Sequence, residues 1–164
     1  MRRMWSKPQL LEAVEQESKL NGIKVFEDIK DKNGNLRFIE GDIEIEETFE
    51  TAGMSQSYGK WSLSGTHLML VLAGEIADTS VITYGKLATI ELPTWVENKI
   101  YPVISSFLDS KTISCRDESW ETQDIQVALV KEAGHLVLYV ISASITFTSD
   151  KGFRISFDLL IDNE

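Results

Sequence analysis

The final stretch of the sequence carries the pattern that most narrows the possible folds. In residues 153–161 every second residue is apolar, and polar residues stand at three of the four positions between them. A period of two is that of a β-strand with one face in a core and the other in solvent. The apolar positions are Phe153, Ile155, Phe157, Leu159 and Ile161. The pattern predicts a half-buried strand, which is typical of an antiparallel sheet.

Similar but shorter apolar segments recur from Tyr58 onward, each bounded by Gly, Asp, Ser or Lys. The predicted strands before the last one are residues 60–63, 66–73, 85–91, 111–115, 125–130, 135–141 and 143–148. Their spacing is typical of a jelly roll or β-sandwich. Residues 131–134 and 149–152 are short glycine-containing turns, which indicate antiparallel neighbours and hence a C-terminal meander. We predict a mainly β fold, an antiparallel jelly roll or β-sandwich.

The first 45 residues differ from the rest and predict a short N-terminal helix followed by a hairpin arm. Ser6 and Gln9 have the spacing of a helix capping box, and Asn21-Gly22 supplies a stop. Asn33-Gly34 between apolar runs is a strong hairpin signal. An isolated helix of this length is marginal in water, so we expect the arm to dock on a partner. The expected docking residues are Trp5, Leu10, Val14, Phe26 and Phe38. This divides the chain into an arm of residues 1–45 and a sandwich of residues 46–164.

Two further segments predict single elements. Residues 40–47 alternate acidic residues with isoleucine, which indicates a strand with one solvated face. Residues 92–100 break the β pattern, because Pro93 favours the first turn of a helix and Val96 and Ile100 share a helix face. We expect a short helix or helical turn there.

Charge and hydropathy exclude several classes of partner. The formal net charge of −10 repels nucleic acid. The longest apolar run, residues 68–73, is far shorter than the roughly 20 residues of a membrane-spanning helix. The N-terminus has no apolar stretch of the secretory-signal type. Cys115, the single cysteine, can form no internal disulfide. We therefore predict no nucleic-acid partner and no membrane insertion.

The sequence contains no recognisable catalytic or metal-binding motif. His67 and His135 each follow a turn and are predicted to be residues at strand ends. A calcium-loop spacing in residues 31–42 has Leu36 where the loop requires glycine, so we interpret this segment as a solvated hairpin. Its ligand-type residues are Asp31, Asn33, Asn35 and Asp42. We predict no enzyme, no cofactor and no bound metal.

Aromatic residues are the remaining candidates for a binding role. Trp61 and Trp95 are predicted to lie in the core or in a subunit interface. Trp120 lies in the polar segment 116–122, where a large aromatic side chain gains little from burial. We name Trp120 and Tyr84 as candidate ligand-binding or partner-binding residues.

The order of these segments resembles that of accessory virion proteins of tailed bacteriophages. The resemblance is carried by residues 26–29 and 37–41 of the arm, then by residues 58–68, and later by residues 92–96 and 100–102. Those proteins carry a trimeric jelly roll of the C1q or tumour-necrosis-factor type on an N-terminal segment that docks to the particle. The resemblance implies a homotrimeric fibre, tail or head-appendage protein. It would be assembled in the host cytoplasm, bound to other virion proteins and available for host attachment.

Three hypotheses about function follow. The first is a non-enzymatic structural protein of a virion, as the resemblance implies. The second is a carbohydrate-binding β-sandwich module that contacts a host surface glycan, since Trp120 and the tyrosines could stack on sugar rings. The third is a glycosidase, for which only the abundant carboxylates speak. The first agrees best with the absence of a catalytic motif.

Overall fold

The computed structural model describes residue 34 and residues 38–116, 122–142, 144–148 and 151–161. The chain divides into two compact units, Met1–Ile39 and Glu40–Glu164. The predicted N-terminal helix, most of the hairpin arm and four of its docking residues lie outside the described part, and so does Trp120. The four are Trp5, Leu10, Val14 and Phe26. The proposed division at residue 45 stays a prediction.

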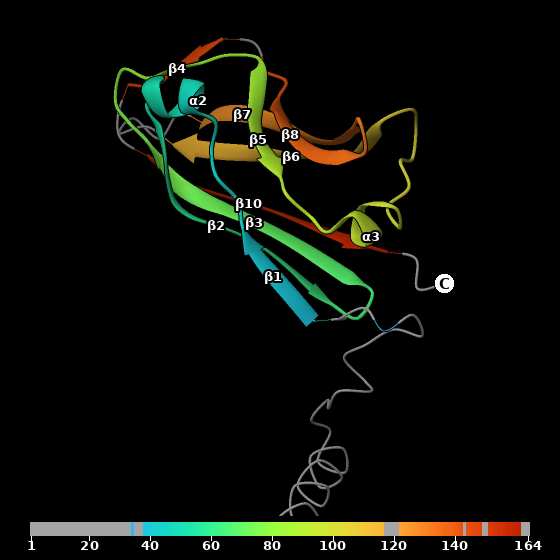
Figure 1. Ribbon diagram of the computed structural model, residues 1–164. Helices are drawn as coiled ribbons and strands as arrows, with labels where there is room; N and C mark the ends of the chain where they lie inside the picture. Colours follow the sequence, from blue (N-terminus) through green and yellow to red (C-terminus); the bar gives the residue numbers. More distant parts are fainter. Residues whose placement is uncertain (1–33, 35–37, 117–121, 143, 149–150, 162–164) are drawn as a thin grey trace, which may run out of the picture. The chain divides into compact units, whose positions relative to one another are not determined.

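Two four-stranded sheets make up the sandwich (Figure 1). The first has the order β1-β2-β3-β10, with β1 Phe38–Asp42, β2 Met54–Ser64, β3 His67–Ile76 and β10 Lys151–Leu160. The second has the order β5-β8-β7-β6, with β5 Gly85–Ile90, β6 Phe107–Arg116, β7 Thr122–Glu132 and β8 His135–Val140. Strands β4 (Val81–Ile82) and β9 (Ile145–Thr146) form a separate antiparallel pair. The prediction of a mainly β, antiparallel sandwich is confirmed.

The core lies between the two sheets and is built from alternating residues of the strands. On β10, Phe153, Ile155 and Phe157 are buried, whereas Arg154, Ser156 and Asp158 are exposed. The same alternation buries side chains of β2 and β3, namely Trp61, Leu63, Leu68, Leu70 and Leu72. Strand β10 also lies beside β6 of the second sheet, which closes one side of the sandwich. The period of two in the sequence therefore marks the face that packs inward.

The predicted C-terminal meander is wrong. Strands β7 and β8 do form a hairpin, in which Glu132 lies opposite His135. However, β9 pairs with β4, and β10 pairs with β3 in the other sheet, where Phe157 lies opposite Leu70. A short connection allows antiparallel pairing of successive strands but does not require it. An alternating strand can bury its apolar face from either sheet of a sandwich, so the pattern could not choose between them.

The helices are short. Helix α2 (Glu47–Thr51) buries Phe49, and helix α3 (Thr94–Glu97) begins directly after Pro93. The predicted helical turn in residues 92–100 is confirmed, with Val96 and Ile100 buried. The strand predicted through residue 47 is too long, because β1 ends at Asp42. Neither helix in the described part of the chain is long and apolar enough to cross a membrane.

Candidate functional site

Residues 43–46, here called the linking segment, connect β1 to α2 and bridge the two sheets. The amide of Ile43 donates to the carbonyl of Gly59 on β2 at 2.9 Å, and the amide of Glu46 donates to the carbonyl of Leu87 on β5 at 2.8 Å. The side chains of Ile43 and Ile45 are buried, and those of Glu44 and Glu46 are exposed. The in-out alternation predicted for residues 40–47 thus persists beyond the end of β1.

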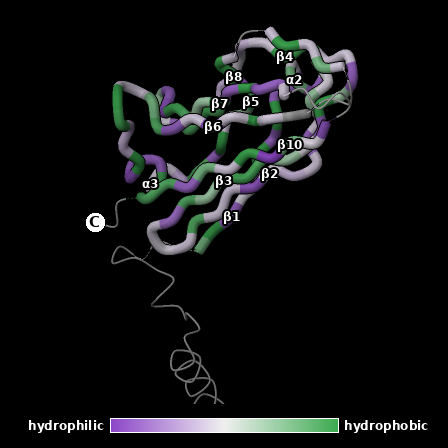
Figure 2. The backbone as a smooth tube through the Cα atoms, turned by 180° about the vertical axis from the view of Figure 1, so that it is seen from behind, coloured by the Kyte–Doolittle hydropathy of each residue, from purple (hydrophilic) through white to green (hydrophobic). Residues whose placement is uncertain are grey.

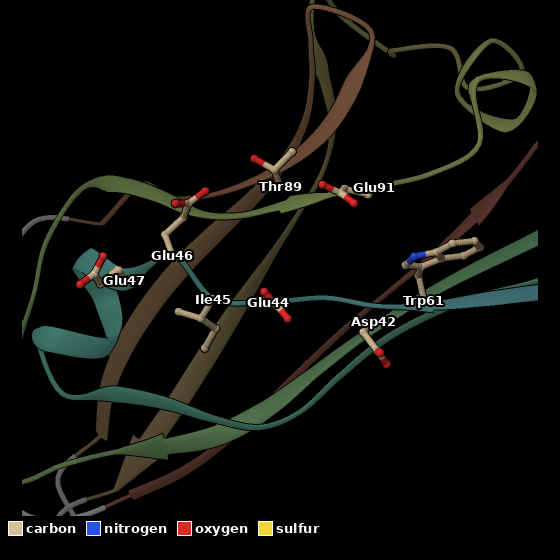
Figure 3. A pocket seen from close by; sticks show the side chains of 9 residues that line it. Asp42, Glu44, Ile45, Glu46, Glu47, Trp61, Thr89 and Glu91 are labelled. Carbon is tan, nitrogen blue, oxygen red and sulfur yellow. The ribbon is translucent and has the colours of Figure 1, made fainter.

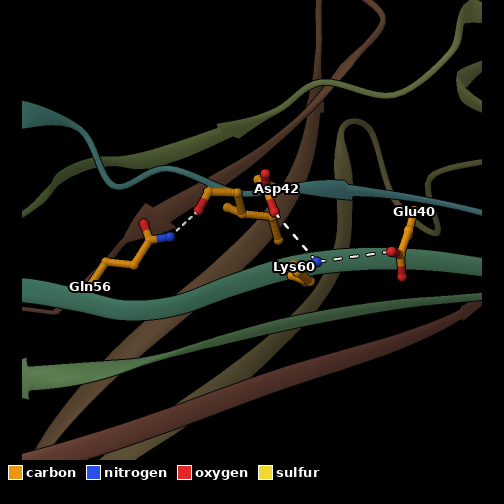
Figure 4. Close-up of polar contacts among 5 residues, drawn as sticks. Glu40, Asp42, Gln56 and Lys60 are labelled. Atoms are coloured by element: carbon orange, nitrogen blue, oxygen red, sulfur yellow. Dashed lines mark hydrogen bonds and ion pairs between the residues drawn. The ribbon is translucent and has the colours of Figure 1, made fainter.

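The side-chain amide of Gln56 fixes the linking segment from β2. Its Oε1 accepts a hydrogen bond from the Ile45 amide at 2.8 Å. Its Nε2 donates to the Ile43 carbonyl (Figure 4). Nearby, Lys60 Nζ lies 3.9 Å from a carboxylate oxygen of Glu40 and 3.8 Å from one of Asp42. β1 ends at Asp42, and beyond it the side chain of Gln56 supplies two hydrogen bonds of the kind that a neighbouring strand supplies through its backbone.

An acidic pocket of about 520 Å³ lies along the linking segment, between it and β5 (Figure 3). Five carboxylates, one threonine, one tryptophan, one isoleucine and one glycine form its wall. They are Asp42, Glu44, Glu46, Glu47, Glu91, Thr89, Trp61, Ile45 and Gly41. The lining residues come from β1, the linking segment, α2, β2, β5 and the residue after β5. The fold thus gathers residues that lie far apart in the sequence.

Trp61 supplies the aromatic part of the pocket wall. Its residue is only 5% exposed, and the nitrogen-bearing edge of the indole faces into the pocket (Figure 3). Within the described residues the indole N–H has no hydrogen-bond acceptor. The ring lies directly over Gly41, where an added Cβ would stand 2.6 Å from Trp61 Cε2. Gly41 therefore gives the indole the room that it occupies.

The carboxylates of the pocket are poorly neutralised. Asp42 has Lys60 as a partner, but the side chains of Glu44, Glu46, Glu47 and Glu91 form no hydrogen bond or ion pair with any described residue, and Glu46 interacts with Lys86 only through its charge. Among the described residues, no three acidic, histidine or cysteine side chains are grouped closely enough to hold a metal ion. The described carboxylates of the pocket are therefore separate hydrogen-bond acceptors around its wall and do not form a binding site for one metal ion.

A second polar and aromatic cluster surrounds Tyr84. The sequence names Tyr84 and Trp120 as binding candidates, and of these two the structure describes Tyr84. Tyr84 is 69% exposed and stacks on Tyr139, with ring centroids 6.2 Å apart and planes inclined by 25°. Lys86 Nζ lies 5.9 Å from the centre of the Tyr139 ring and 3.2 Å from Glu132 Oε1. The Tyr139 hydroxyl donates to the other carboxylate oxygen of Glu132. Together these groups form an exposed aromatic surface with charged groups at its edge.

The contacts in this cluster shift three pKa values. The hydrogen bond from the Tyr139 hydroxyl, followed by the one from Lys86, lowers the pKa of Glu132 below its usual value. The same carboxylate raises the pKa of Tyr139 and that of Lys86, because both groups keep their protons more tightly beside a negative charge. All three groups are open to solvent, so the shifts report proximity and no large stabilisation.

The loop from Tyr101 to Phe107, here called the apolar loop, is the most exposed hydrophobic segment of the described chain. Tyr101, Val103 and Ile104 are 70%, 74% and 71% exposed, and Figure 2 shows a hydrophobic stretch between α3 and β6. The amide of Val103 donates to the Phe107 carbonyl at 2.9 Å, and the amide of Phe107 donates to the Ile104 carbonyl at 2.8 Å. These bonds give the loop a defined conformation.

Lys131 supports the start of this loop from β7. Its Nζ donates to the carbonyl oxygens of Glu97 at 2.6 Å and Ile100 at 2.9 Å, and its amide donates to the Ser106 carbonyl. The carboxylate of Glu97 is buried and lies 2.8 Å from Nδ1 of His135. His135 starts β8, as predicted, but it also partners this buried acid.

The structure places the other residues named from the sequence as follows. Trp61 is buried, as predicted, whereas Trp95 is half-buried and lies under Lys99 Nζ, 5.2 Å from the ring centre. Phe38, at the start of β1, is 60% exposed. The binding roles of Tyr84, Trp120 and Phe38 stay predictions. Sequence reasoning missed Tyr139, which lies inside the predicted strand at residues 135–141; the polar end of its ring could have marked it as a binding candidate.

No protein-family model matches the sequence, and no curated protein matches it. Among solved structures, the chain is similar to the reovirus attachment protein sigma1, crystallised in complex with alpha-2,3-sialyllactose. The similarity covers 85% of this chain and 88% of that chain, at 11% sequence identity and a TM-score of 0.39. This neighbour is a viral attachment protein. A likeness at this level carries no argument about function.

Proposed function

We propose that this chain is a non-enzymatic assembly and attachment protein whose β-sandwich associates into a homotrimer through the apolar loop. The observation that carries the proposal is the exposure of Tyr101, Val103 and Ile104 on neighbouring positions of one loop. Clustered apolar side chains on a surface mark sites of association. Because hydrogen bonds already order the loop, binding through it costs little additional conformational entropy.

A second copy of this chain is the partner that the charge distribution favours. Each copy carries a net charge of −10, so two copies repel one another over most of their surface. Residues 100–108 contain no charged side chain, which makes this segment a place where copies can approach closely. In a symmetric assembly, the same loop of each copy can meet its equivalents around an axis. The number three comes from the resemblance to C1q-type and tumour-necrosis-factor-type jelly rolls.

The sequence resemblance also supports a place for the assembly. We propose a fibre, tail or head-appendage component of a virion, in which residues 1–45 dock to other virion proteins and the sandwich is available to a host surface. Virion localisation follows from the same proposal. The absence of a catalytic motif from the sequence supports a binding role over an enzymatic one.

Light scattering of the full-length chain tests the proposal. We expect a mass three times 18.5 kDa for the natural sequence and a monomer for Ile104→Asp, because three carboxylates would meet at the axis. Leu160→Asp is the matched control, since Leu160 is 73% exposed on β10 and lies outside the loop. A monomeric natural chain would contradict the proposal. A trimer that Ile104→Asp leaves intact would show that the loop is not the contact.

A carbohydrate-binding module is the second candidate, and the exposed Tyr84–Tyr139 stack favours it. Stacked aromatic side chains beside Lys86 and Glu132 offer both an apolar face and hydrogen-bonding groups, which sugar rings require. We expect glycan-array signals that Tyr84→Ala or Trp120→Ala reduces. An empty array for the natural chain would retire this candidate.

A further inference from the structure

The buried indole N–H of Trp61 is the unmet group in the acidic pocket. A donor on a buried side chain that has no acceptor in the protein is uncommon, and a molecule in the pocket, water or a ligand, has to satisfy it. Trp61 is 5% exposed, its nitrogen edge faces into the pocket, and no described residue accepts its proton. The pocket therefore presents a fixed donor to whatever enters it.

The carboxylates around the pocket set the opposite requirement. Glu44, Glu46 and Glu91 are acceptors without a hydrogen-bonding partner among the described side chains, so an occupant has to donate hydrogen bonds. A ligand that satisfies the whole wall must both donate and accept. Ammonium and guanidinium groups only donate, and a phosphate or carboxylate would meet five like charges. A metal ion is disfavoured by the separation of the carboxylates in the described residues.

Hydroxyl groups meet both requirements, since each one donates once and accepts through its lone pairs. We propose that the pocket binds a neutral polyhydroxylated ligand, a sugar of one or two rings, with one hydroxyl oxygen accepting from Trp61 Nε1 and other hydroxyls donating to the carboxylates. The volume of about 520 Å³ falls in the usual range for small-molecule sites. The pocket thereby favours uncharged over acidic sugars.

The indole resonance of Trp61 gives a direct test. The chain contains four tryptophans, and Trp61→Phe identifies the signal of this one in a nitrogen–proton spectrum. The full-length protein is titrated with glucose, galactose, mannose, N-acetylglucosamine and lactose. Matched probes are alpha-2,3-sialyllactose, which adds a negative charge to lactose, and spermidine, which only donates. We expect a saturable shift of the Trp61 signal with at least one neutral sugar and none with spermidine.

Variants then show how much each residue of the pocket wall contributes to sugar binding. The sugar used is the one that shifts the Trp61 signal, and calorimetry measures its affinity for each variant. Trp61→Phe keeps a ring but removes the donor and is expected to weaken sugar binding about five-fold. Glu91→Gln is expected to weaken it several-fold, because an amide oxygen is a weaker acceptor than a carboxylate. Glu75→Gln is the control, because it removes the same charge from an exposed position of β3 outside the pocket. This variant should bind the sugar as the natural chain does.

Two results would overturn the inference. One is a Trp61 signal that no neutral sugar moves in a folded protein. The other is a shift produced by spermidine, since that would make the pocket a cation site. Both results are read from the indole signal of Trp61, so they do not depend on whether the protein is a monomer or a trimer. A monomer that binds sugar would refute the proposed assembly and leave the pocket assignment intact.

Discussion

Replacing Gln56 by leucine should destabilise the protein far more than its position on a strand near the edge of the sheet suggests. The change keeps the size of the side chain but removes two hydrogen bonds to the linking segment, from the Ile45 amide at 2.8 Å and to the Ile43 carbonyl. Each net hydrogen bond contributes about 1 kcal/mol, and each backbone group left without a partner in a partly buried site costs about 1–3 kcal/mol. Because the segment can shift and admit water, we expect a total loss of about 2–4 kcal/mol.

Urea denaturation followed by tryptophan fluorescence measures this loss, and amide hydrogen exchange at Ile45 shows where it occurs. Ser57→Ala is the matched control, since its exposed hydroxyl makes one bond to the Ala73 carbonyl at 3.1 Å. The control should cost less than about 1 kcal/mol. A Gln56→Leu protein as stable as Ser57→Ala, with an unchanged exchange rate at Ile45, would refute the view that Gln56 holds the linking segment.

Three further changes test other parts of the structure. Lys131→Met should lower the free energy of unfolding by about 1–2 kcal/mol in urea, because the carbonyls of Glu97, at the end of α3, and of Ile100 lose their cation; an unchanged midpoint would contradict this. Tyr139→Phe should raise the pKa of Glu132, because the carboxylate loses the hydrogen bond from the Tyr139 hydroxyl; NMR of the side-chain carboxyl group measures this pKa. A lowered folded-state pKa gives stability that is present above the unfolded pKa and lost as pH falls through the folded one, so this variant should lose less stability in acid. Gly53→Ala should cost about 1–3 kcal/mol, since Gly53 has φ +98° and its Cβ would meet the Ser80 side chain; natural stability in urea would contradict this strain.

The strands could be located from the sequence because their alternation is local. The predicted strand at residues 153–161 corresponds to β10, Lys151–Leu160, and the predicted strand at residues 135–141 corresponds to β8, His135–Val140. Which strands pair could not be predicted, because pairing depends on segments far apart in the chain. The partner of Phe157 is Leu70, and nothing near either residue in the sequence indicates this.

The candidate sites could be predicted only in part, for a similar reason. Burial of Trp61 follows from its place in an apolar strand, but the lack of an acceptor for its indole depends on residues from β1 and β5 that the fold brings near. The exposure of Glu44 and Glu46 was expected from the alternation of residues 40–47, whereas their gathering with Glu91 was not. Hydrogen bonding of side chains is set by tertiary neighbours, which a local pattern does not contain.

The distribution of charge links the two proposals. Carboxylates gather around the pocket and make copies of the chain repel one another there, while residues 100–108 carry no charge. The same acidic surface that suits a neutral hydroxylated ligand therefore favours association through the apolar loop over association through the pocket. Salt screens exposed charges over about 10 Å at 0.1 M ionic strength, so added salt should weaken this discrimination and leave the apolar contact itself in place. An assembly held by the loop should consequently keep its mass as ionic strength rises, whereas one held by ion pairs would dissociate.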